Sequence, residues 1–474
     1  MKQQINRITD ILRRDDGISG AMHYTEQISW ILFLKFLDDF ETREADNALL
    51  DGRDYNYTID EKYRWKNWAH GENKQTSWDD LKDFVNKELF PYFKSFRSVG
   101  EDYHSLKYKI GEIFSFIDNR IDSGHTLREI LDIIDELSFQ NDLDLFELSQ
   151  VYEDLLQGMG SDGWNSWEFY TPRSIIKMMV QSLEPKIGQT IYDPAVGSGG
   201  FLIQAYDYMI KQDKTEKELQ FLKQQTFFGN EKTGLAYIMW VMNLILHGIS
   251  NPNIVKKNTL TTDIRQIQEK DRFDIVLANP PFGWKEKEII QQNFSIKTNA
   301  TEMLFMQHIM KHMKLWWKAA IVIPEWVLFN TGKAFQDIKK TLLEDFNLHS
   351  IVSLPAGVFL PYSWVKTNVI FFDRQGSTKD IWFYEINLWR KLTKNKPITY
   401  KEIQHIPELL KTKAITENSW IVKVQDIQDY DISAKNPNKK AEAKIRKPDE
   451  ILQELQANEI EISKALSELS HILK

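Results

Sequence analysis

Residues 192–201 read YDPAVGSGGF, and a short run of β-branched and aromatic residues that begins at Thr190 leads into them. Three of the four residues from Gly197 to Gly200 are glycine, which lets a backbone turn tightly and approach a ligand closely. An ordinary turn between a strand and a helix needs fewer glycines. The stretch therefore predicts a binding loop between the first strand of a sheet and a helix that begins near Phe201.

Similar apolar runs follow along the chain, separated by amphipathic stretches, at residues 226–229, 273–277, 319–323, 349–352 and 369–372. Nearly continuous apolar strands that alternate with helices indicate a parallel sheet covered on both faces. Ligands of such sheets bind beyond the carboxyl ends of the strands. Residues 1 to about 160 show helical spacing instead, as in 127–134, and predict a separate α-helical domain.

The chain has 474 residues, a formal net charge of −8 and no cysteine. This length predicts two or three domains, and the lack of cysteine excludes disulfides and thiolate sites and fits an intracellular, cytoplasmic protein. The N-terminus has no signal-peptide core, and the richest apolar stretch, 235–246, is shorter than the ~20 residues of a membrane span. We expect a buried helix there, no membrane association, and no metal site, because the histidines are scattered.

The acidic net charge bears on one class of partner, nucleic acid. A protein that binds DNA alone usually carries a basic face, because neutralisation of phosphates supplies most non-specific affinity. If this chain acts on DNA, it either borrows affinity from a partner or carries a local basic channel within an acidic whole.

The glycine-rich loop matches neither of two common nucleotide-binding patterns. A dinucleotide loop needs glycine at position 202, which is Leu, and a P-loop needs a Gly-Lys-Ser/Thr ending that is absent. The remaining features are Asp193, just before the glycine-rich loop, and Glu231, after the second predicted strand. A carboxylate in the position of Glu231 is suited to accept hydrogen bonds from ribose hydroxyls. This set resembles the S-adenosylmethionine site of a class I methyltransferase.

The second unusual stretch is Asn279-Pro280-Pro281-Phe282, at the end of a predicted strand. Two prolines fix the backbone over several residues. The Asn279 side-chain carbonyl and the Pro280 carbonyl could hold both hydrogens of an exocyclic amino group, and Phe282 could stack on a planar base. Preorganised acceptors would then stabilise the ammonium that develops during methyl transfer. The alternative is an ordinary Asn-Pro turn, which the cofactor loop upstream makes less attractive.

These stretches resemble a known family. Residues 193–201 and 279–283 look like motifs I and IV of the amino-methyltransferases that act on adenine N6, and 169–173 look like motif X. The order X, I, IV is that of the gamma class. Further stretches are similar to the modification (M) subunits of type I restriction-modification systems, namely 32–37, 354–359 with 366–368, and 430–437.

The resemblance implies an α/β fold: a Rossmann-like, mostly parallel methyltransferase domain with an α-helical N-terminal domain and a C-terminal helix. The expected domains are 1–160, 161–435 and 436–474, the last serving subunit assembly. The implied partners are double-stranded DNA, a specificity subunit that takes two M subunits, and a restriction subunit with a motor.

The resemblance also implies site residues. The catalytic set is Asn279, Pro280 and Phe282, and the cofactor set is Glu168, Phe169, Tyr170, Thr171, Pro172, Arg173, Asp193, Pro194, Ala195, Gly197, Ser198, Gly199, Gly200, Glu231 and Asn258. The family often has Asp where this chain has Asn258 to hold the cofactor's adenine, and Asp263 is a possible substitute.

Three alternatives stay open. Segment 284–300 is either a lid that closes over a flipped base or an ordinary solvated helix-loop. The apolar stripe of Leu452, Leu455, Ile462, Leu466, Leu469 and Leu473 marks a helix that packs either on a partner chain or on its own domain. The chemistry also suits an amino-methyltransferase of ribosomal RNA or of a protein glutamine, or a non-catalytic scaffold with a degenerate site.

Overall fold

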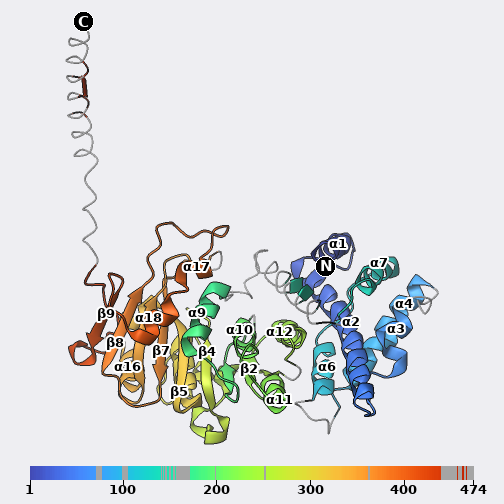
Figure 1. Cartoon of the computed structure of the whole chain (residues 1–474), viewed down its shortest axis with the longest axis horizontal. Helices are drawn as coiled ribbons and strands as arrows, with labels where there is room; N and C mark the ends of the chain where they lie inside the picture. Colours follow the sequence, from blue (N-terminus) through green and yellow to red (C-terminus); the bar gives the residue numbers. More distant parts are fainter. Residues whose placement is uncertain are drawn as a thin grey trace.

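The computed structural model describes residues 1–70, 77–98, 105–139, 171–197, 199–249, 252–360 and 363–438, with scattered positions between 141 and 155 and between 456 and 466. Within these residues, a group of N-terminal helices lies beside a large sheet that is itself covered by helices (Figure 1).

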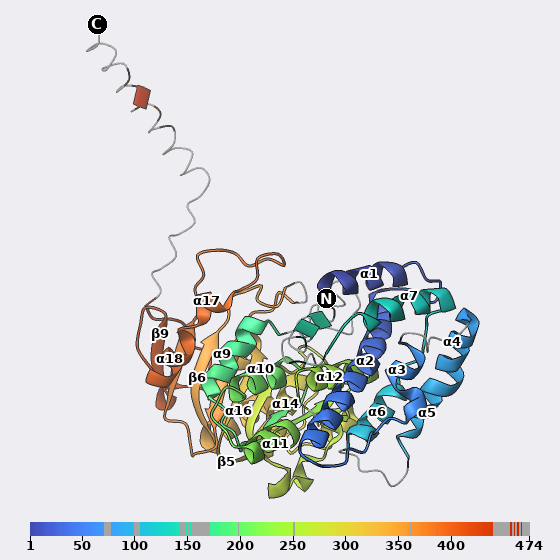
Figure 2. The same cartoon turned by 45° about the vertical axis from the view of Figure 1, so that its right-hand side comes forward.

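The N-terminal part is helical, as the sequence predicted. Its helices are α1 (Lys2–Leu12), α2 (Ala21–Leu50), α3 (Trp65–Trp68), α4 (Trp78–Phe84), α5 (Phe90–Ser95), α6 (Leu106–Phe114) and α7 (Gly124–Asp135), with short 3-10 and π segments at Glu61–Tyr63 and Val85–Leu89. The long helix α2 is buried on all sides from residue 24 to 39 because the other helices and the sheet domain surround it (Figure 2).

Nine strands form one sheet in the order β3-β2-β1-β4-β5-β7-β6-β8-β9. They are β1 (Ile191–Asp193), β2 (Phe227–Glu231), β3 (Asn253–Lys256), β4 (Phe273–Ala278), β5 (Met313–Pro324), β6 (Asn347–Ser353), β7 (Thr367–Asp373), β8 (Asp380–Glu385) and β9 (Ser419–Lys423). All neighbours are parallel except the pairs that involve β7 or β9. Strands β1 to β6 and β8 therefore end at one edge, hereafter the carboxyl edge, where β7 and β9 begin.

The mostly parallel, class I methyltransferase-like sheet that the sequence predicted is confirmed, with differences. The six predicted runs correspond to β1, β2, β4, β5, β6 and β7, whereas β3, β8 and β9 were not predicted. Strand β3 has only the four residues Asn253–Lys256, too few to show a clear period of apolar residues, and it is an outermost strand of the sheet. The antiparallel direction of β7 could not be predicted from its apolar run, because the composition of a strand depends on its burial and not on its direction.

Helices cover both faces of the sheet. One face packs on α9 (Arg173–Leu183), α10 (Gly200–Met209), α11 (Glu216–Gln224), α12 (Gly234–Leu246) and α18 (Ile406–Thr412), and the other on α14 (Thr301–His312) and α16 (Lys333–Glu344). The apolar stretch 235–246 is α12, which packs between the sheet and α2 as a buried helix. Among the described helices, none combines the length and the apolarity that crossing a membrane requires.

A buried lysine joins the N-terminal helices to the sheet domain. Lys109 of α6 donates to the carbonyl of Ile254 in β3 (2.9 Å), and its ammonium lies 3.7 Å from Glu112. Burial lowers the pKa of Lys109, while the nearby Glu112 opposes that change. Because removing one partner of such a pair leaves the other buried and unpaired, this contact fixes how the two parts meet.

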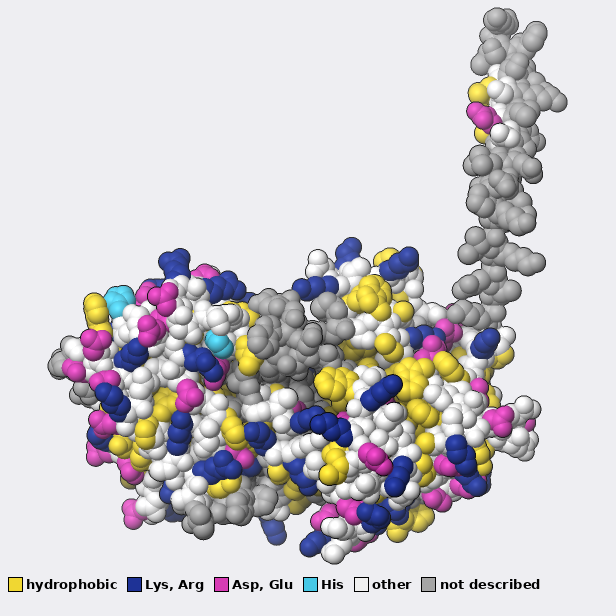
Figure 3. Space-filling view, turned by 180° about the vertical axis from the view of Figure 1, so that it is seen from behind, with side chains coloured by type: hydrophobic (Ala, Val, Ile, Leu, Met, Phe, Trp, Pro, Cys, Tyr) yellow, Lys and Arg dark blue, Asp and Glu magenta, His cyan; other side chains and the backbone are white. Residues whose placement is uncertain are grey.

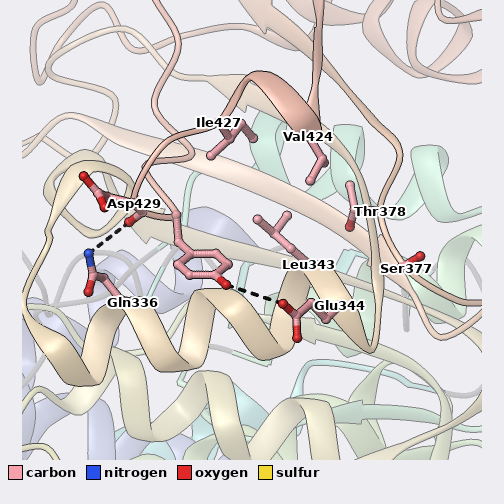
Figure 4. A pocket seen from close by; sticks show the side chains of 9 residues that line it. Gln336, Leu343, Glu344, Ser377, Thr378, Val424, Ile427 and Asp429 are labelled. Atoms are coloured by element: carbon pink, nitrogen blue, oxygen red, sulfur yellow. Dashed lines mark hydrogen bonds between the residues drawn. The ribbon is translucent and has the colours of Figure 1, made fainter.

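The chain leaves the sheet after β9 through a segment held against α16. The side chain of Gln336 donates to the carbonyl of Asp429 (3.3 Å), and Tyr430 donates to Glu344 (3.4 Å), at a cavity of about 680 Å³ (Figure 4). Asp429 and Tyr430 both have positive φ, 50° and 55°, which costs conformational energy in residues other than glycine. Those two contacts oppose this strain and aim the next residues back towards the carboxyl edge.

The predicted assembly helix near the C-terminus falls mostly outside the described residues. Two members of its apolar stripe are described, Ile462 and Leu466; both are helical and 61% and 62% exposed.

Candidate active site

The glycine-rich loop leaves β1 at the carboxyl edge and is tied to β2. Val196 N–H donates to the Asn230 carbonyl, and Gly197 N–H donates to Glu231 Oε2, both at 3.1 Å. Gly197 and Gly199 have φ of 46° and 67°, the left-handed region that favours glycine. The loop then enters α10 at Gly200, as predicted for a helix beginning near Phe201.

Gly229, in the middle of β2, lets this loop lie against the strand. A Cβ at this position would come within 2.3 Å of Val196 Cγ2 and 2.9 Å of the Asp193 carbonyl oxygen. Any larger residue would push the loop outwards. The position of the loop at the strand ends therefore depends on a glycine outside the loop itself.

Asp193 is the most perturbed carboxyl group in this region. Its Oδ1 accepts a hydrogen bond from Ala195 N–H (3.0 Å), while its Oδ2 is buried and has no hydrogen-bond partner among the described residues. Burial, with a smaller contribution from the charge of Glu231, raises the pKa of Asp193 to about 8. A buried acceptor with a spare oxygen suits a ligand that brings its own positive charge or hydrogen-bond donors.

The two carboxylates beyond Asp193 differ in how they are engaged. Glu231 accepts bonds from Gly197 N–H and from the N–H and hydroxyl of Thr233, the latter two at 2.9 and 2.8 Å, yet each carboxylate oxygen retains acceptor capacity. Both oxygens of Asp263 are held by Arg265, at 2.7 and 2.8 Å. Asn258 uses Oδ1 to cap the next turn through Leu260 N–H (3.1 Å), and nothing described occupies its Nδ2.

The Asn-Pro-Pro-Phe stretch follows β4, the strand beside β1. Asn279 is buried, and its Nδ2 donates to the hydroxyl of Thr171 (2.8 Å). That bond fixes the amide so that Oδ1 is the free end, and Oδ1 is buried without a partner among the described residues. An unsatisfied buried carbonyl is costly, so this geometry suits a ligand that donates a hydrogen.

Residues from two other segments hold this stretch. Phe282 packs edge-to-face on Phe359, with ring centroids 6.1 Å apart, and Glu302 at the start of α14 accepts a hydrogen bond from Gly283 N–H. Burial raises the pKa of Glu302. Thr301 donates its hydroxyl to the Trp284 carbonyl (3.0 Å), so the first turn of α14 fixes the end of the Asn-Pro-Pro-Phe stretch.

The predicted site residues divide into three groups. Thr171, Asp193, Pro194, Ala195, Gly197, Gly199, Gly200, Glu231, Asn258, Asn279, Pro280 and Phe282 lie on the loops at the carboxyl edge, with Pro172 and Arg173 at the start of α9. Glu168, Phe169, Tyr170 and Ser198 lie outside the described residues. Asp263, the alternative to Asn258, is occupied by its ion pair with Arg265.

Sequence reasoning missed Glu302 and the Phe359 contact with Phe282. Phe359 lies in the stretch 354–359, which was noted only for its resemblance to the family. Glu302 follows a threonine at the start of a helix, a pattern too common to indicate a functional residue. Neither sequence position indicates which residue it contacts, because each contact joins segments that are far apart in the sequence.

Two more of the resemblance stretches meet at a cavity of about 960 Å³ on the same edge. Lys366 and Asn368 line it from the start of β7, and Ser433 to Asn436 line it from the segment beyond β9. The structure thus brings together stretches that are separated by more than 60 positions in the sequence.

Comparisons with known proteins agree with this geometry. The family model described as N-6 DNA Methylase matches residues 142–448, and the HsdM N-terminal domain model matches residues 1–134. The chain is 34% identical to the type I restriction enzyme EcoEI methylase subunit of Escherichia coli, over 99% of this chain and 96% of that one.

Solved structures are also similar over nearly the whole chain. One is that of a type I restriction enzyme modification subunit from Vibrio vulnificus YJ016, with a TM-score of 0.86 and 35% identity, covering 93% of this chain and 98% of that one. Another comes from work on complex assembly and conformational transition of a type I restriction-modification system. Its TM-score is 0.80 at 40% identity, over 99% of this chain and 97% of that one.

The sheet, with helices on both faces and a helical N-terminal part, has the fold of a class I methyltransferase, a class that uses S-adenosylmethionine. The matched family model covers most of the chain and narrows this class to enzymes that methylate DNA. The chain belongs to the N-6 DNA methylases, as a modification subunit of a type I restriction-modification system.

Proposed function

We propose that this chain transfers the methyl group of S-adenosylmethionine to N6 of an adenine flipped out of duplex DNA, within a complex that contains a specificity subunit. The observation that supports this best is the Asn279 amide. Thr171 holds its nitrogen, and its buried Oδ1 has no other described partner. A planar amino group presents two hydrogens, one for this oxygen and one for the Pro280 carbonyl.

The residues fit the cofactor. Its two hydroxyls would meet Glu231, its adenine would meet Asn258, and the amino-acid end would lie near Asp193 and the stretch from Glu168 to Arg173. Gly197, Ser198, Gly199 and Gly200, with Pro194 and Ala195, would allow close approach of the loop backbone. The spare, buried Oδ2 of Asp193 is the feature of the structure that favours this fit, because the cofactor is cationic. When bound, the cofactor supplies an electrophilic methyl group.

The chain's own residues supply positioning and electrostatics. Asn279 Oδ1 and the Pro280 carbonyl would each accept one hydrogen of the adenine amino group, which leaves the nitrogen lone pair aimed at the methyl donor. As this nitrogen becomes cationic, the same two acceptors stabilise it without reorganisation. Phe282, held by Phe359, would stack on the extruded base. Flipping costs a few kcal/mol, which these contacts must offset.

The partners follow from the same proposal. A specificity subunit would read the DNA sequence, with two M subunits per specificity subunit, and a restriction subunit with a motor would join them. We place this complex in the cytoplasm. The C-terminal segment 436–474 would assemble it, in line with the exposure of Ile462 and Leu466.

The main test is substrate choice. Tritiated methyl transfer should go to duplex DNA rather than to ribosomal RNA or protein, since the family matches favour DNA over those alternatives. Transfer mainly to RNA or protein would refute the proposal. Calorimetry with S-adenosylmethionine tests the remaining scaffold alternative, which requires that no binding occurs.

Asn279→Ala should abolish methylation and leave cofactor binding nearly unchanged, because Asn279 faces the base and not the glycine-rich loop. Methylation and S-adenosylmethionine affinity are measured on the same preparation. Residual methylation near the wild-type rate would mean that the Asn-Pro-Pro-Phe stretch is not the catalytic one.

A further inference from the structure

A basic loop follows β8 at the carboxyl edge, the edge that also carries Asn279. Between Ile386 and Lys401 the sequence has Arg390, Lys391, Lys394, Lys396 and Lys401 and no acidic residue, in a chain whose net charge is −8. Trp389 is 92% exposed in the same loop. This basic loop, residues 387–397, lies between β8 and α17 (Tyr400–Ile403).

The basic loop is well ordered in spite of its exposure. The Arg390 guanidinium donates to the carbonyls of Lys396 and Pro397 (both 2.7 Å) and to Glu402 (2.8 and 2.9 Å), while Thr393 and Lys396 exchange backbone hydrogen bonds. Arg390 thereby neutralises Glu402, the first acidic residue after the loop. The ammonium groups of Lys391, Lys394 and Lys396 are exposed and have no ion-pair partner in the described part of the chain.

The base of the basic loop is fastened next to the catalytic stretch. Ser174, in the first turn of α9, donates to the Ile398 carbonyl (3.0 Å), and three residues earlier Thr171 holds Asn279. On its other side the loop meets residues 354–359, since a Cβ on Gly357 would lie 3.6 Å from Leu392 Cβ. That second stretch ends at Phe359, the partner of Phe282.

Charge and position together identify a partner. Residues 354–366 also carry no acidic residue. Lys366 is paired with Glu325 (2.6 Å), and Glu385 ends β8 just before the basic loop, so among the described residues here the unpaired positive charge is that of the three loop lysines. Figure 3 shows Lys and Arg side chains beside hydrophobic ones along the upper rim of the molecule. Cations without an ion-pair partner favour a polyanion, and an exposed aromatic ring beside them favours contact with sugar or base.

We infer that the basic loop binds the phosphate backbone of the DNA duplex next to the adenine that is methylated. Lys391, Lys394 and Lys396 contact phosphates, and Trp389 lies against the neighbouring sugars or bases. This inference rests on the proposed function, since it places DNA at the same edge. It also locates the positive surface that the acidic net charge conceals.

The test uses the full chain assembled with its specificity subunit. Binding of a fluorescein-labelled DNA duplex is followed by anisotropy at salt concentrations from about 50 to 200 mM. The variant Lys391→Gln/Lys394→Gln/Lys396→Gln should bind at least about tenfold more weakly at 0.1 M salt and lower the slope of log affinity against log salt by up to about 2.7. Trp389→Ala should weaken binding at every salt concentration and leave the slope unchanged.

The matched control removes the same charge from the opposite edge of the sheet. Lys211→Gln/Lys217→Gln/Lys270→Gln changes three exposed lysines near the ends of α10, α11 and the start of β4. It should leave both affinity and slope near the wild-type values.

Three outcomes would overturn the inference. An unchanged salt slope in the loop variant would show that the lysines contact no phosphate. Failure of that variant to assemble with the specificity subunit would assign the loop to a protein interface. If the wild-type complex neither binds nor methylates duplex DNA, the proposed function fails as well; the first two outcomes leave it intact.

Discussion

Asn279 shows how one buried hydroxyl can determine what an amide is able to recognise. An asparagine side chain can turn either its oxygen or its nitrogen towards a ligand. Thr171 Oγ1 accepts from Nδ2 at 2.8 Å, which leaves Oδ1 as the end that faces a donor. Because Thr171 also belongs to the stretch expected beside the cofactor, one residue links the two halves of the site.

Thr171→Val should lower the maximal methylation rate by at least about tenfold and destabilise the fold by ~1–3 kcal/mol, since Asn279 Nδ2 would be buried without an acceptor. Thr171→Ser keeps the hydroxyl and should retain most of the rate. Rates at saturating DNA and cofactor, together with urea unfolding, provide the comparison. Equal rates for Val and Ser would mean that the bond does not orient the amide.

Asp193 makes the stability of the ligand-free chain depend on pH. Its folded pKa of about 8 lies above the ordinary 3.8, so folding favours the protonated carboxyl. The resulting stabilisation is complete below the unfolded pKa and is lost as pH rises through the folded pKa. The Tm of the wild type should therefore fall relative to that of Asp193→Asn between about pH 5 and pH 8.5.

A thermal scan of both proteins across that pH range measures this difference, and a constant gap would contradict it. Asp193→Asn should also weaken S-adenosylmethionine binding, because the neutral amide cannot pair with a cationic ligand.

At the scale of elements, segment 284–300 is anchored at both ends and exposed in its middle. Lys285 forms an isolated antiparallel bridge with Ala300, and Glu286 N–H donates to the Asn299 carbonyl (2.8 Å). The Gln307 side chain bonds both the N–H and the carbonyl of Ile296, each at 2.9 Å, and Phe294 is buried. Trp284 and Ile289 are 49% and 70% exposed. These contacts confine any lid movement to the middle of the segment, residues 287–292, which includes α13 (Glu288–Gln291).

We expect amides of 287–292 to gain protection from hydrogen exchange when the full complex binds DNA, whereas amides of 293–300 should be protected with or without it. Mass spectrometry of peptides from the two regions measures this. If residues 287–292 show no gain in protection, the segment is an ordinary solvated helix-loop.

The sequence predicted elements and loops better than the contacts between them. The glycine-rich loop and the Asn-Pro-Pro-Phe stretch could be found because local backbone demands select glycine and proline. The bond between Thr171 and Asn279 spans 108 positions, and no local pattern indicates it. Similarly, Glu302 was missed because its role is to accept a hydrogen bond from Gly283 N–H. That contact depends on where α14 starts in the fold and not on the local sequence.

Across the whole molecule, assembly is expected to depend on the far C-terminus. The exposed pair Ile462 and Leu466 lies one turn apart on a helix, as an apolar stripe requires. Deleting residues 448–474 should weaken assembly with the specificity subunit, as should Ile462→Gln/Leu466→Gln. Size-exclusion chromatography measures complex formation, with Ser463→Gln as a control at an exposed position outside the stripe. Normal assembly of the truncated chain would show that the helix serves its own domain.

The reversed strand β7 has a consequence for how such a protein can diversify. Strand β6 ends and β7 begins at the carboxyl edge, with Ser353 opposite Asn368, so the connection between them starts and ends at the edge that carries Asn279. Insertions or replacements in 354–366 would reshape the surroundings of the substrate and leave strand register untouched. Changes in the connections at the opposite edge of the sheet would not alter the methyl-transfer reaction. Lineages should therefore vary freely at that opposite edge, and variation at 354–366 should track changes in substrate handling.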